Sequence, residues 1–231
     1  MLLYQPEEGY CYNSDSLFLY DFVSTFKPRG RVLDVGAGSG IVGLLVARDN
    51  DKVNLEAVEK QEAFVFYARK NAAINKIPYK VHQTDFLDFN DEKGFEYIIS
   101  NPPFYHEGAS RSDNTMLHQA RYNLHLPLEK FVAKVAKLLR PQGHFIFCYD
   151  SQQFGLICAA LTAVKLRVID VQFVHSKRDK NAFLVLVHAR KNSKSLMKTW
   201  PPFISADEKG FSSKAQAIFD TARTHSIKCQ R

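Results

Sequence analysis

Residues 31–40 read RVLDVGAGSG, a short run of strand-forming residues that leads directly into a glycine-rich loop. Residues 41–47 continue with helical periodicity, so the stretch predicts a strand, a tight turn and a helix in succession. Glycines at 36, 38 and 40 let the backbone turn sharply and approach a ligand with no Cβ in the way. The start of the helix adds unpaired N–H groups that face the same place.

This loop favours a cationic amino-acid ligand over a pyrophosphate. Its Gly-x-Gly-x-Gly spacing differs from the Gly-x-Gly-x-x-Gly of dinucleotide-binding folds. Asp34 stands two residues before the first glycine, where its carboxylate can accept a hydrogen bond from a ligand amine. We therefore expect the loop to form part of a cofactor site, with the residues Asp34, Gly36, Ala37, Gly38 and Gly40.

Strand-like runs alternate with helical periods along most of the chain. After 31–35, further strands are predicted over 53–58, 79–82, 97–100 and 144–149, and helices over 41–47, 61–75, 128–139 and 153–164. Two longer strands, 167–174 and 182–189, flank a polar turn at 176–181. This order predicts an α/β fold with a doubly wound seven-stranded sheet, mostly parallel with an antiparallel last strand, and helices on both faces.

We expect the chain to be organised in three parts. Residues 1–28 form an N-terminal cap over the cofactor pocket, 29–192 the core, and 193–231 a C-terminal extension packed on the core and ending in a helix at 213–225. Residues 105–119 are long, polar and poorly periodic, which is typical of a functional loop. From His175 to Arg231 there are 12 lysines and arginines against 4 acidic residues, whereas the whole chain carries a net charge of +7. This basic quarter indicates a polyanionic partner.

Composition argues against several other classes of protein. The four cysteines form no Cys-x-x-Cys pair and have no nearby histidine at metal spacing, so we expect reduced thiols and no metal site. No stretch approaches the roughly 20 apolar residues of a membrane span, and residues 1–10 do not resemble a signal peptide. We expect a cytoplasmic protein with no membrane partner.

Acidic residues follow the second and third predicted strands. Glu59 lies about 20 residues after the glycine loop, where an acid can bind both ribose hydroxyls of a nucleoside. Lys60 follows Glu59 directly, and we include it among the residues expected to bind the cofactor. Asp85 can accept from an adenine amino group while Phe86 packs on the ring, although a turn aspartate is also common.

The tetrapeptide Asn101-Pro102-Pro103-Phe104 directly follows the apolar strand at 97–100. Two successive prolines fix φ and remove two N–H donors, and the first of them pushes Asn101 into an extended conformation. The result is a stiff edge that presents the Asn101 side-chain oxygen and the Pro102 carbonyl as acceptors. Phe104 adds a flat apolar face on which a base can stack.

The ordered set DVGAGSG, VE, TDF and NPPF resembles the class I S-adenosylmethionine-dependent methyltransferases, with their Rossmann-like fold, and within them the small-domain group with an N-P-P-[FY] motif. A finer resemblance is to bacterial tRNA adenine-N6 methyltransferases that modify the base beside the anticodon of a valine tRNA. It is carried by Gln5-Pro6 to Tyr10, Asp15-Ser16-Leu17 and Gln119-Ala120-Arg121. Phe104, where tyrosine is also frequent, and the lysine-rich tail depart from that family.

The resemblance implies S-adenosyl-L-methionine as cofactor and tRNA as partner, and we expect a monomer. It implies cofactor-binding roles for Asp34, Gly36, Ala37, Gly38, Gly40, Glu59, Lys60, Asp85, Phe86 and Asn101, and catalytic roles for Asn101, Pro102, Pro103 and Phe104. Asp15 and Ser16 would close over the cofactor. The substrate contacts would include Tyr105 and Arg121, although Arg121 is also typical of a helix start. The charge of Lys177 and Arg178 suits contacts with RNA phosphate, although a charged hairpin turn is also common.

The motif suits a planar amino group, whose nitrogen is a poor nucleophile because its lone pair is delocalised. Two acceptors that hold both hydrogens favour a pyramidal nitrogen with its lone pair aimed at the methyl group. Catalysis then depends on positioning and electrostatics, without a strong general base. The tetrapeptide does not choose among adenine-N6 of tRNA, guanine-N2 of rRNA and a protein glutamine, and a non-catalytic RNA-binding subunit is a further alternative.

Overall fold

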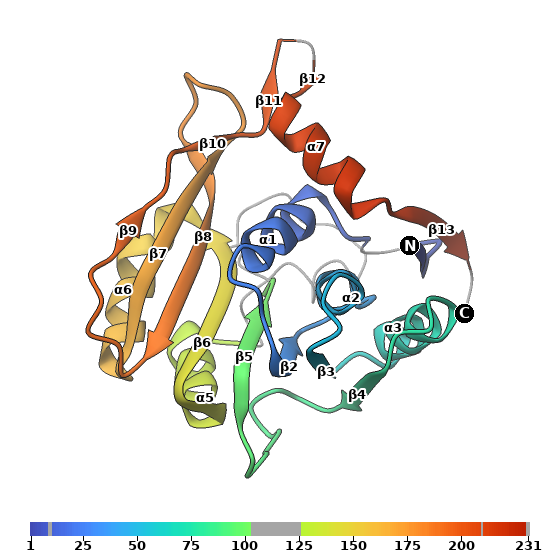
Figure 1. Ribbon diagram of the computed structural model, residues 1–231, viewed down its shortest axis with the longest axis horizontal. Coiled ribbons are helices and arrows are strands. Elements are labelled where there is room, and N and C mark those ends of the chain that lie inside the picture. The colour runs from blue at the N-terminus through green and yellow to red at the C-terminus, as the bar shows by residue number, and fades with distance from the viewer. Residues whose placement is uncertain (9–10, 103–125, 209, 230–231) are drawn as a thin grey trace.

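The computed structural model describes residues 1–8, 11–102, 126–208 and 210–229. A nine-stranded sheet forms its centre, in the order β10-β7-β8-β6-β5-β2-β3-β4, with β9 also paired to β7 (Figure 1). Its strands are β2 (Gly30–Val35), β3 (Val53–Glu59), β4 (Tyr79–Gln83), β5 (Phe95–Ser100), β6 (Leu139–Asp150), β7 (Leu166–His175), β8 (Ala182–Lys191), β9 (Lys198–Thr199) and β10 (Phe203–Ile204).

The predicted seven-stranded sheet is confirmed, because β2 to β8 form it and two short strands extend its edge. Every pairing in it is parallel except those of β8, which runs antiparallel to both β6 and β7. Helices α1 (Ser14–Ser24), α2 (Ile41–Arg48) and α3 (Glu62–Ile74) cover one face, and α5 (Leu128–Leu138) and α6 (Phe154–Ala163) cover the other (Figure 1).

The central strands are buried on both faces, as parallel sheets require. On β6, residues 145–149 are all fully or almost fully buried, and the rings of Phe145 and Phe147 stack with centroids 4.3 Å apart. Phe131 of α5 packs edge-on against Phe145. Packing in the core therefore holds in place the ends of the strands, from which the connecting loops extend.

The ends of the chain differ from the expectation. The last helix, α7 (Ser213–Ala222), ends three residues early because Arg223 adopts a left-handed φ of 46°. The next residues form β13 (His225–Cys229), which pairs in parallel with β1 (Leu2–Pro6), so both chain ends lie side by side (Figure 1). Another small hairpin, β11 (Ala206–Asp207) with β12 (Gly210–Phe211), precedes α7.

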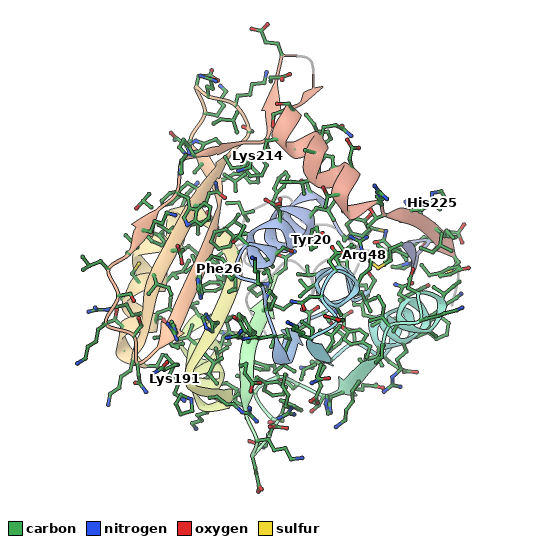
Figure 2. The ribbon with its side chains drawn as sticks, in the orientation of Figure 1. Tyr20, Phe26, Arg48, Lys191, Lys214 and His225 are labelled. Atoms are coloured by element: carbon green, nitrogen blue, oxygen red, sulfur yellow. The ribbon has the colours of Figure 1, made fainter. Side chains whose placement is uncertain are left out.

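Contacts from α2 hold this C-terminal segment in place. Arg48 donates to the carbonyls of Thr221 and Ala222 at the end of α7 and also pairs with Asp49, which accepts from Tyr20 of α1 (Figure 2). The main-chain N–H of His225 donates to the carbonyl of Met1 over 2.8 Å. The division into cap, core and extension stays a prediction.

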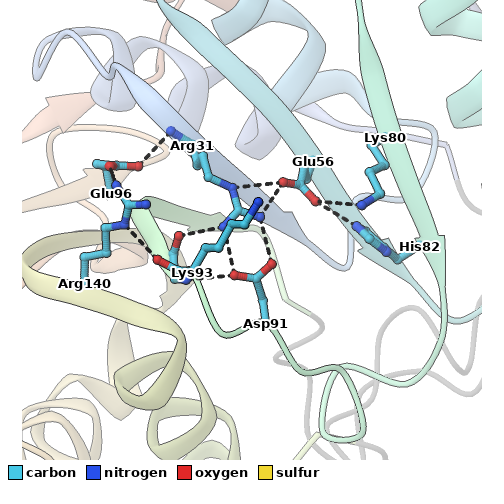
Figure 3. A network of polar contacts seen from close by, with 9 residues as sticks. Arg31, Glu56, Lys80, His82, Asp91, Lys93, Glu96 and Arg140 are labelled. Atoms are coloured by element: carbon cyan, nitrogen blue, oxygen red, sulfur yellow. Dashed lines mark hydrogen bonds and ion pairs between the residues drawn. The ribbon is translucent and has the colours of Figure 1, made fainter.

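A polar network links residues near the amino ends of β2, β5 and β6 to Glu56 in the middle of β3 (Figure 3). Arg31 of β2 binds both carboxylate oxygens of Asp91 at 2.8 Å and Glu56 of β3 at 2.6 Å. Its main-chain N–H donates to Glu96 of β5, which pairs with Arg140 of β6. Hydrogen bonding to the Arg31 guanidinium is the main cause that lowers the pKa of Asp91 to about 2.

Replacing Arg31 by leucine should destabilise the fold without touching the site. The change leaves Asp91 without the Arg31 guanidinium and Glu56 with only His82 and Lys80 as basic partners, at a cost of about 2–3 kcal/mol for this partly buried network. We expect Tm to fall by about 5–10 °C in thermal denaturation. An unchanged Tm would contradict the structural role of the network, and Lys93→Ala, with an exposed side chain nearby, serves as the control.

Candidate active site

The register of the sheet brings three predicted loops together. Val35 at the end of β2 pairs with Ser100 of β5 on one side and Val58 of β3 on the other. Ser100 Oγ donates to the Val35 carbonyl at 2.8 Å, and the Gly36 N–H donates to the Val58 carbonyl at 2.9 Å. The residues that follow these strands therefore lie beside one another at the carboxyl edge, where ligands bind in such folds.

The backbone of the glycine loop opens into a cavity. Gly36 and Gly38 have φ values of 66° and 55°, and a Cβ built on either would meet no atom within 4 Å. Gly40, at φ 87°, has a packing role instead, since a Cβ there would lie 3.1 Å from the Tyr79 ring. Side chains from α1, α2 and α3 complete the cavity, which is lined by Tyr12, Ser16, Asp34, Gly36, Ala37, Gly38, Ser39, Ile41, Val42, Phe64 and Asn101.

Six of these lining residues were predicted from the sequence: Ser16, Asp34, Gly36, Ala37, Gly38 and Asn101. Ser39, Ile41 and Val42, which follow the glycines, and the aromatic residues Tyr12 and Phe64 were not. Tyr12 precedes α1 and is oriented by its hydroxyl, which donates to Thr224 at 2.9 Å. Phe64 lies in the first turn of α3 and is buried. No local signal separates either aromatic side chain from ordinary packing, because their position depends on how the helices dock on the sheet.

Two buried carboxylates support the loop from below. Glu59 accepts from the Gly38 N–H through Oε2 and from the Gln61 N–H through Oε1, both at 2.9 Å. Asp34 accepts from the Gly43 N–H at 3.0 Å. This close approach requires a glycine at position 43, because a Cβ there would lie 2.7 Å from Asp34 Oδ2. Among the described residues, neither carboxylate has a basic partner within ion-pair distance.

Burial raises the pKa of both acids. For Asp34 it raises the pKa to about 7, with a contribution from the charge of Glu59, and for Glu59 it also raises the pKa. Two buried acids beside an open glycine backbone fit a ligand that has both an ammonium group and hydroxyls to donate. An amino acid joined to a nucleoside has these groups, and an additional anion such as pyrophosphate would be repelled.

The raised pKa of Asp34 has a consequence for stability. Its pKa moves from 3.8 to about 7 on folding, so the native state loses stability as pH rises between these values. Asp34→Asn keeps an acceptor for Gly43 and mimics the protonated form. We expect the ligand-free variant to match the unsubstituted protein near pH 4 and to exceed its Tm by at least about 5 °C above pH 7.

Thermal denaturation across that pH range checks this prediction. Asp51→Asn, at an exposed position, is the matched control. If Asp34→Asn gave no gain in Tm above pH 7, the carboxylate would not be held in an unfavourable environment, and it would have no need of a cationic ligand.

Asn101 lies on the wall of this cavity, and Ser16 at the start of α1 holds it. The Asn101 Nδ2 group donates to Ser16 Oγ at 3.0 Å. Asn13 caps α1 by accepting from the Asp15 N–H at 3.2 Å, which fixes the first turn over the loop. Pro102 is buried next to Asn101, whereas the predicted residues Pro103, Phe104, Tyr105 and Arg121 lie outside the described part of the chain.

Other predicted residues lie away from the cavity lining. Lys60 is exposed and pairs with Asp85 at 2.9 Å, beside the end of β3. The ring of Phe86 is buried against Phe131, with centroids 5.5 Å apart, so it faces the core. Lys177 and Arg178 are exposed on the turn between β7 and β8. Within the described ranges, no group of three or more His, Cys, Asp or Glu side chains is placed to hold a metal ion.

Comparison with known families agrees with this geometry. A family model described as "Methyltransferase small domain" matches residues 14–156, which is more than half of the chain. The chain belongs to this family. The matched region extends from α1 to the start of α6 and contains the glycine loop, Glu59 and Asn101.

Curated relatives match about half of this chain in sequence. A protein of Bacteroides thetaiotaomicron named tRNA1(Val) (adenine(37)-N6)-methyltransferase is 37% identical over 120 residues, covering 50% of this chain and 49% of its own length. A protein of Musicola paradisiaca with the same name is 33% identical over 136 residues, covering 56% and 54%. The chain thus spans about half the length of the curated relatives it matches.

Solved structures show the same fold. A "predicted O-methyltransferase" from Agrobacterium tumefaciens superposes with a TM-score of 0.70 at 17% identity, over 93% of this chain and all of that one. A 16S rRNA N2 methyltransferase from T. thermophilus, in complex with AdoMet and guanosine, has a TM-score of 0.56 at 25% identity, over 78% of this chain and 44% of that one.

No described helix is long and apolar enough to cross a membrane.

Proposed function

We propose that the chain is an S-adenosyl-L-methionine-dependent N-methyltransferase that acts on the exocyclic N6 amine of an adenine in tRNA. The observation that carries the proposal is the juxtaposition of the Asn101 carboxamide with the open glycine loop in one cavity. The names of relatives that are 30–37% identical support the choice of tRNA adenine. We also propose that the protein is cytoplasmic and monomeric.

The proposed cofactor contacts come from Asp34 and the glycine loop, which line the cavity, and from acidic residues that follow the neighbouring strands. The carboxylate of Glu59 would accept from the ribose hydroxyls, and Asp34 would face the ammonium end. The backbone of Gly36 and Gly38 leaves room for a ligand to lie against the loop. Asp85 would accept from the adenine amino group, with Lys60 beside it. When bound, the cofactor supplies an electrophilic methyl group.

The proposed role of Asn101 is to prepare the acceptor nitrogen. Its side-chain oxygen and the Pro102 carbonyl would each accept one hydrogen of the amine, so the nitrogen becomes more pyramidal and its lone pair turns toward the methyl group. Acceptors held in place before the reaction stabilise the positive charge that develops on nitrogen. Pro103 would stiffen the segment, and Phe104 and Tyr105 would contact the base.

The turn between β7 and β8 is the proposed contact for the RNA backbone, together with Arg121. It opens on the same edge as Asn101, because β8 runs antiparallel to both β6 and β7. Lys177, Arg178 and Lys180 are exposed there, and no ion pair between them and a described acidic residue is found. Such cations suit phosphate contacts that are independent of sequence.

Replacing Lys177 and Arg178 by alanine should raise the KM for tRNA by about tenfold and leave kcat unchanged, because phosphate contacts supply affinity rather than chemistry. The salt dependence of KM should weaken at the same time. Lys52→Ala with Lys93→Ala, on the opposite edge of the sheet, is the matched control. Equal KM values for the two double variants would contradict this RNA contact.

Radiolabelled methyl transfer tests the proposed function, with unmodified tRNA, rRNA and a protein extract as separate acceptors. We expect label in tRNA. Label only in rRNA would favour guanine-N2 methylation, the activity of the T. thermophilus neighbour, and label only in protein would favour a glutamine acceptor. Cofactor binding without transfer to any of the three would favour a non-catalytic RNA-binding role.

A further inference from the structure

A buried thiol contacts Asn101 from behind. Cys148 lies on β6, one residue past the position where Phe147 pairs with Ser100 of β5, so the sheet register places it next to Asn101. Its Sγ lies 3.0 Å from Asn101 Oδ1, and its side chain is fully buried. The carboxamide is therefore held at both ends, since its Nδ2 group donates to Ser16 Oγ at 3.0 Å.

The contact with the thiol selects one orientation of the carboxamide, because the Ser16 hydroxyl can either donate or accept. An amide has an acceptor oxygen at one end and a donor NH2 at the other, and a thiol donates better than it accepts. Burial, and then the charge of Asp15, raise the pKa of Cys148 well above 9.0, so the thiol keeps its proton at neutral pH. An amide turned by 180° would place its NH2 group against the S–H donor, which is unfavourable.

We propose that Cys148 is a positioning residue that donates its S–H to Asn101 and so orients the carboxamide oxygen toward the acceptor amine. A carbonyl oxygen has two lone pairs. One of them would receive the thiol, and the other would remain for a substrate amine in the cavity that Asn101 lines. Ser16 completes the clamp from α1. This role rests on the proposed function, in which the Asn101 oxygen accepts from the substrate.

Substitution separates a donor from a packing residue. Cys148→Ala removes the donor, whereas Cys148→Ser keeps a hydroxyl in the same place. We expect kcat to fall by about tenfold in the alanine variant, as for loss of a positioning hydrogen bond, with both KM values unchanged. The serine variant should recover most of the loss. Cys158→Ala, a half-buried thiol on α6, is the matched control and should keep full activity.

An infrared measurement tests the contact without any RNA. The S–H stretch of Cys148, identified as the band missing in Cys148→Ala, should move to higher frequency in Asn101→Ala, because the hydrogen bond is lost. A band at the same frequency in both proteins would overturn the contact. A kcat for Cys148→Ala equal to that of the unsubstituted protein would overturn the positioning role.

The two readouts keep the proposals distinct. If the unsubstituted chain methylates no RNA, the proposed function fails, while the infrared band still decides whether the thiol holds Asn101. If the chain is active and the alanine variant does not fold, the serine variant is measured instead. A serine variant that binds the cofactor normally but loses as much kcat as Asn101→Ala would overturn the donor role.

Discussion

Asn101→Ala should lower kcat for methyl transfer by about 100- to 1000-fold, the loss seen when one preorganised polar group is removed from an active site. The substitution removes the side-chain oxygen that accepts from the amine, so the nitrogen keeps its delocalised lone pair. The affinity for the cofactor should fall by less than tenfold, because Asp34 and Glu59 remain in place. Single-turnover assays at saturating cofactor and tRNA measure the chemical step directly.

Asn54→Ala is the control for this variant, because Asn54 is an exposed asparagine near the start of β3, at the opposite edge of the sheet. It should retain full activity. If Asn101→Ala kept kcat within threefold of the unsubstituted chain while its Tm stayed the same, the carboxamide would not contact the reacting amine. The cavity would then have to be assigned another chemistry.

Glu59→Gln should raise the Kd for S-adenosyl-L-methionine by about 100-fold, which corresponds to about 2.7 kcal/mol. The carboxylate accepts main-chain hydrogen bonds on both oxygens, from Gly38 and from Gln61. Glutamine has one acceptor oxygen, and its NH2 group would face one of these N–H donors. The loop would shift, and the ribose would lose one acceptor.

Isothermal titration calorimetry measures this loss of affinity. Glu92→Gln is the matched control, because Glu92 is exposed and lies before β5, away from the cavity. Its Kd should equal that of the unsubstituted chain. If Glu59→Gln bound the cofactor with unchanged affinity, the ribose would not lie at this end of the cavity. The cofactor would then have to bind in another direction.

The elements that carry the site could be predicted from sequence because each has a local signal. The run 31–40 marks a strand, a turn and a helix, and the tetrapeptide after β5 marks a strand end. In a parallel sheet the loops that follow the strands open on one edge, and the observed pairing of β2 with β3 and β5 then brings Gly36, Glu59 and Asn101 together there. The fold class and the edge on which these loops open therefore needed no long-range information, whereas the strand order did.

Other features depend on contacts between distant segments. Strands β1 and β13 are short and partly polar, and they exist because the two chain ends pair with each other. The sequence predicted Phe86 to lie against a ligand ring, whereas the structure packs it on Phe131 of α5, more than 40 residues later in the sequence. Cys148 resembled an ordinary core cysteine until the register of β6 placed it beside Asn101.

Nucleoside analysis tests the central claim most directly. Unmodified tRNA is incubated with the chain and isotope-labelled S-adenosyl-L-methionine, digested to nucleosides and analysed by mass spectrometry. We predict labelled N6-methyladenosine from the unsubstituted chain and none above background from Asn101→Ala. Labelled N2-methylguanosine in its place, or labelled N6-methyladenosine at equal levels from both proteins, would contradict the account.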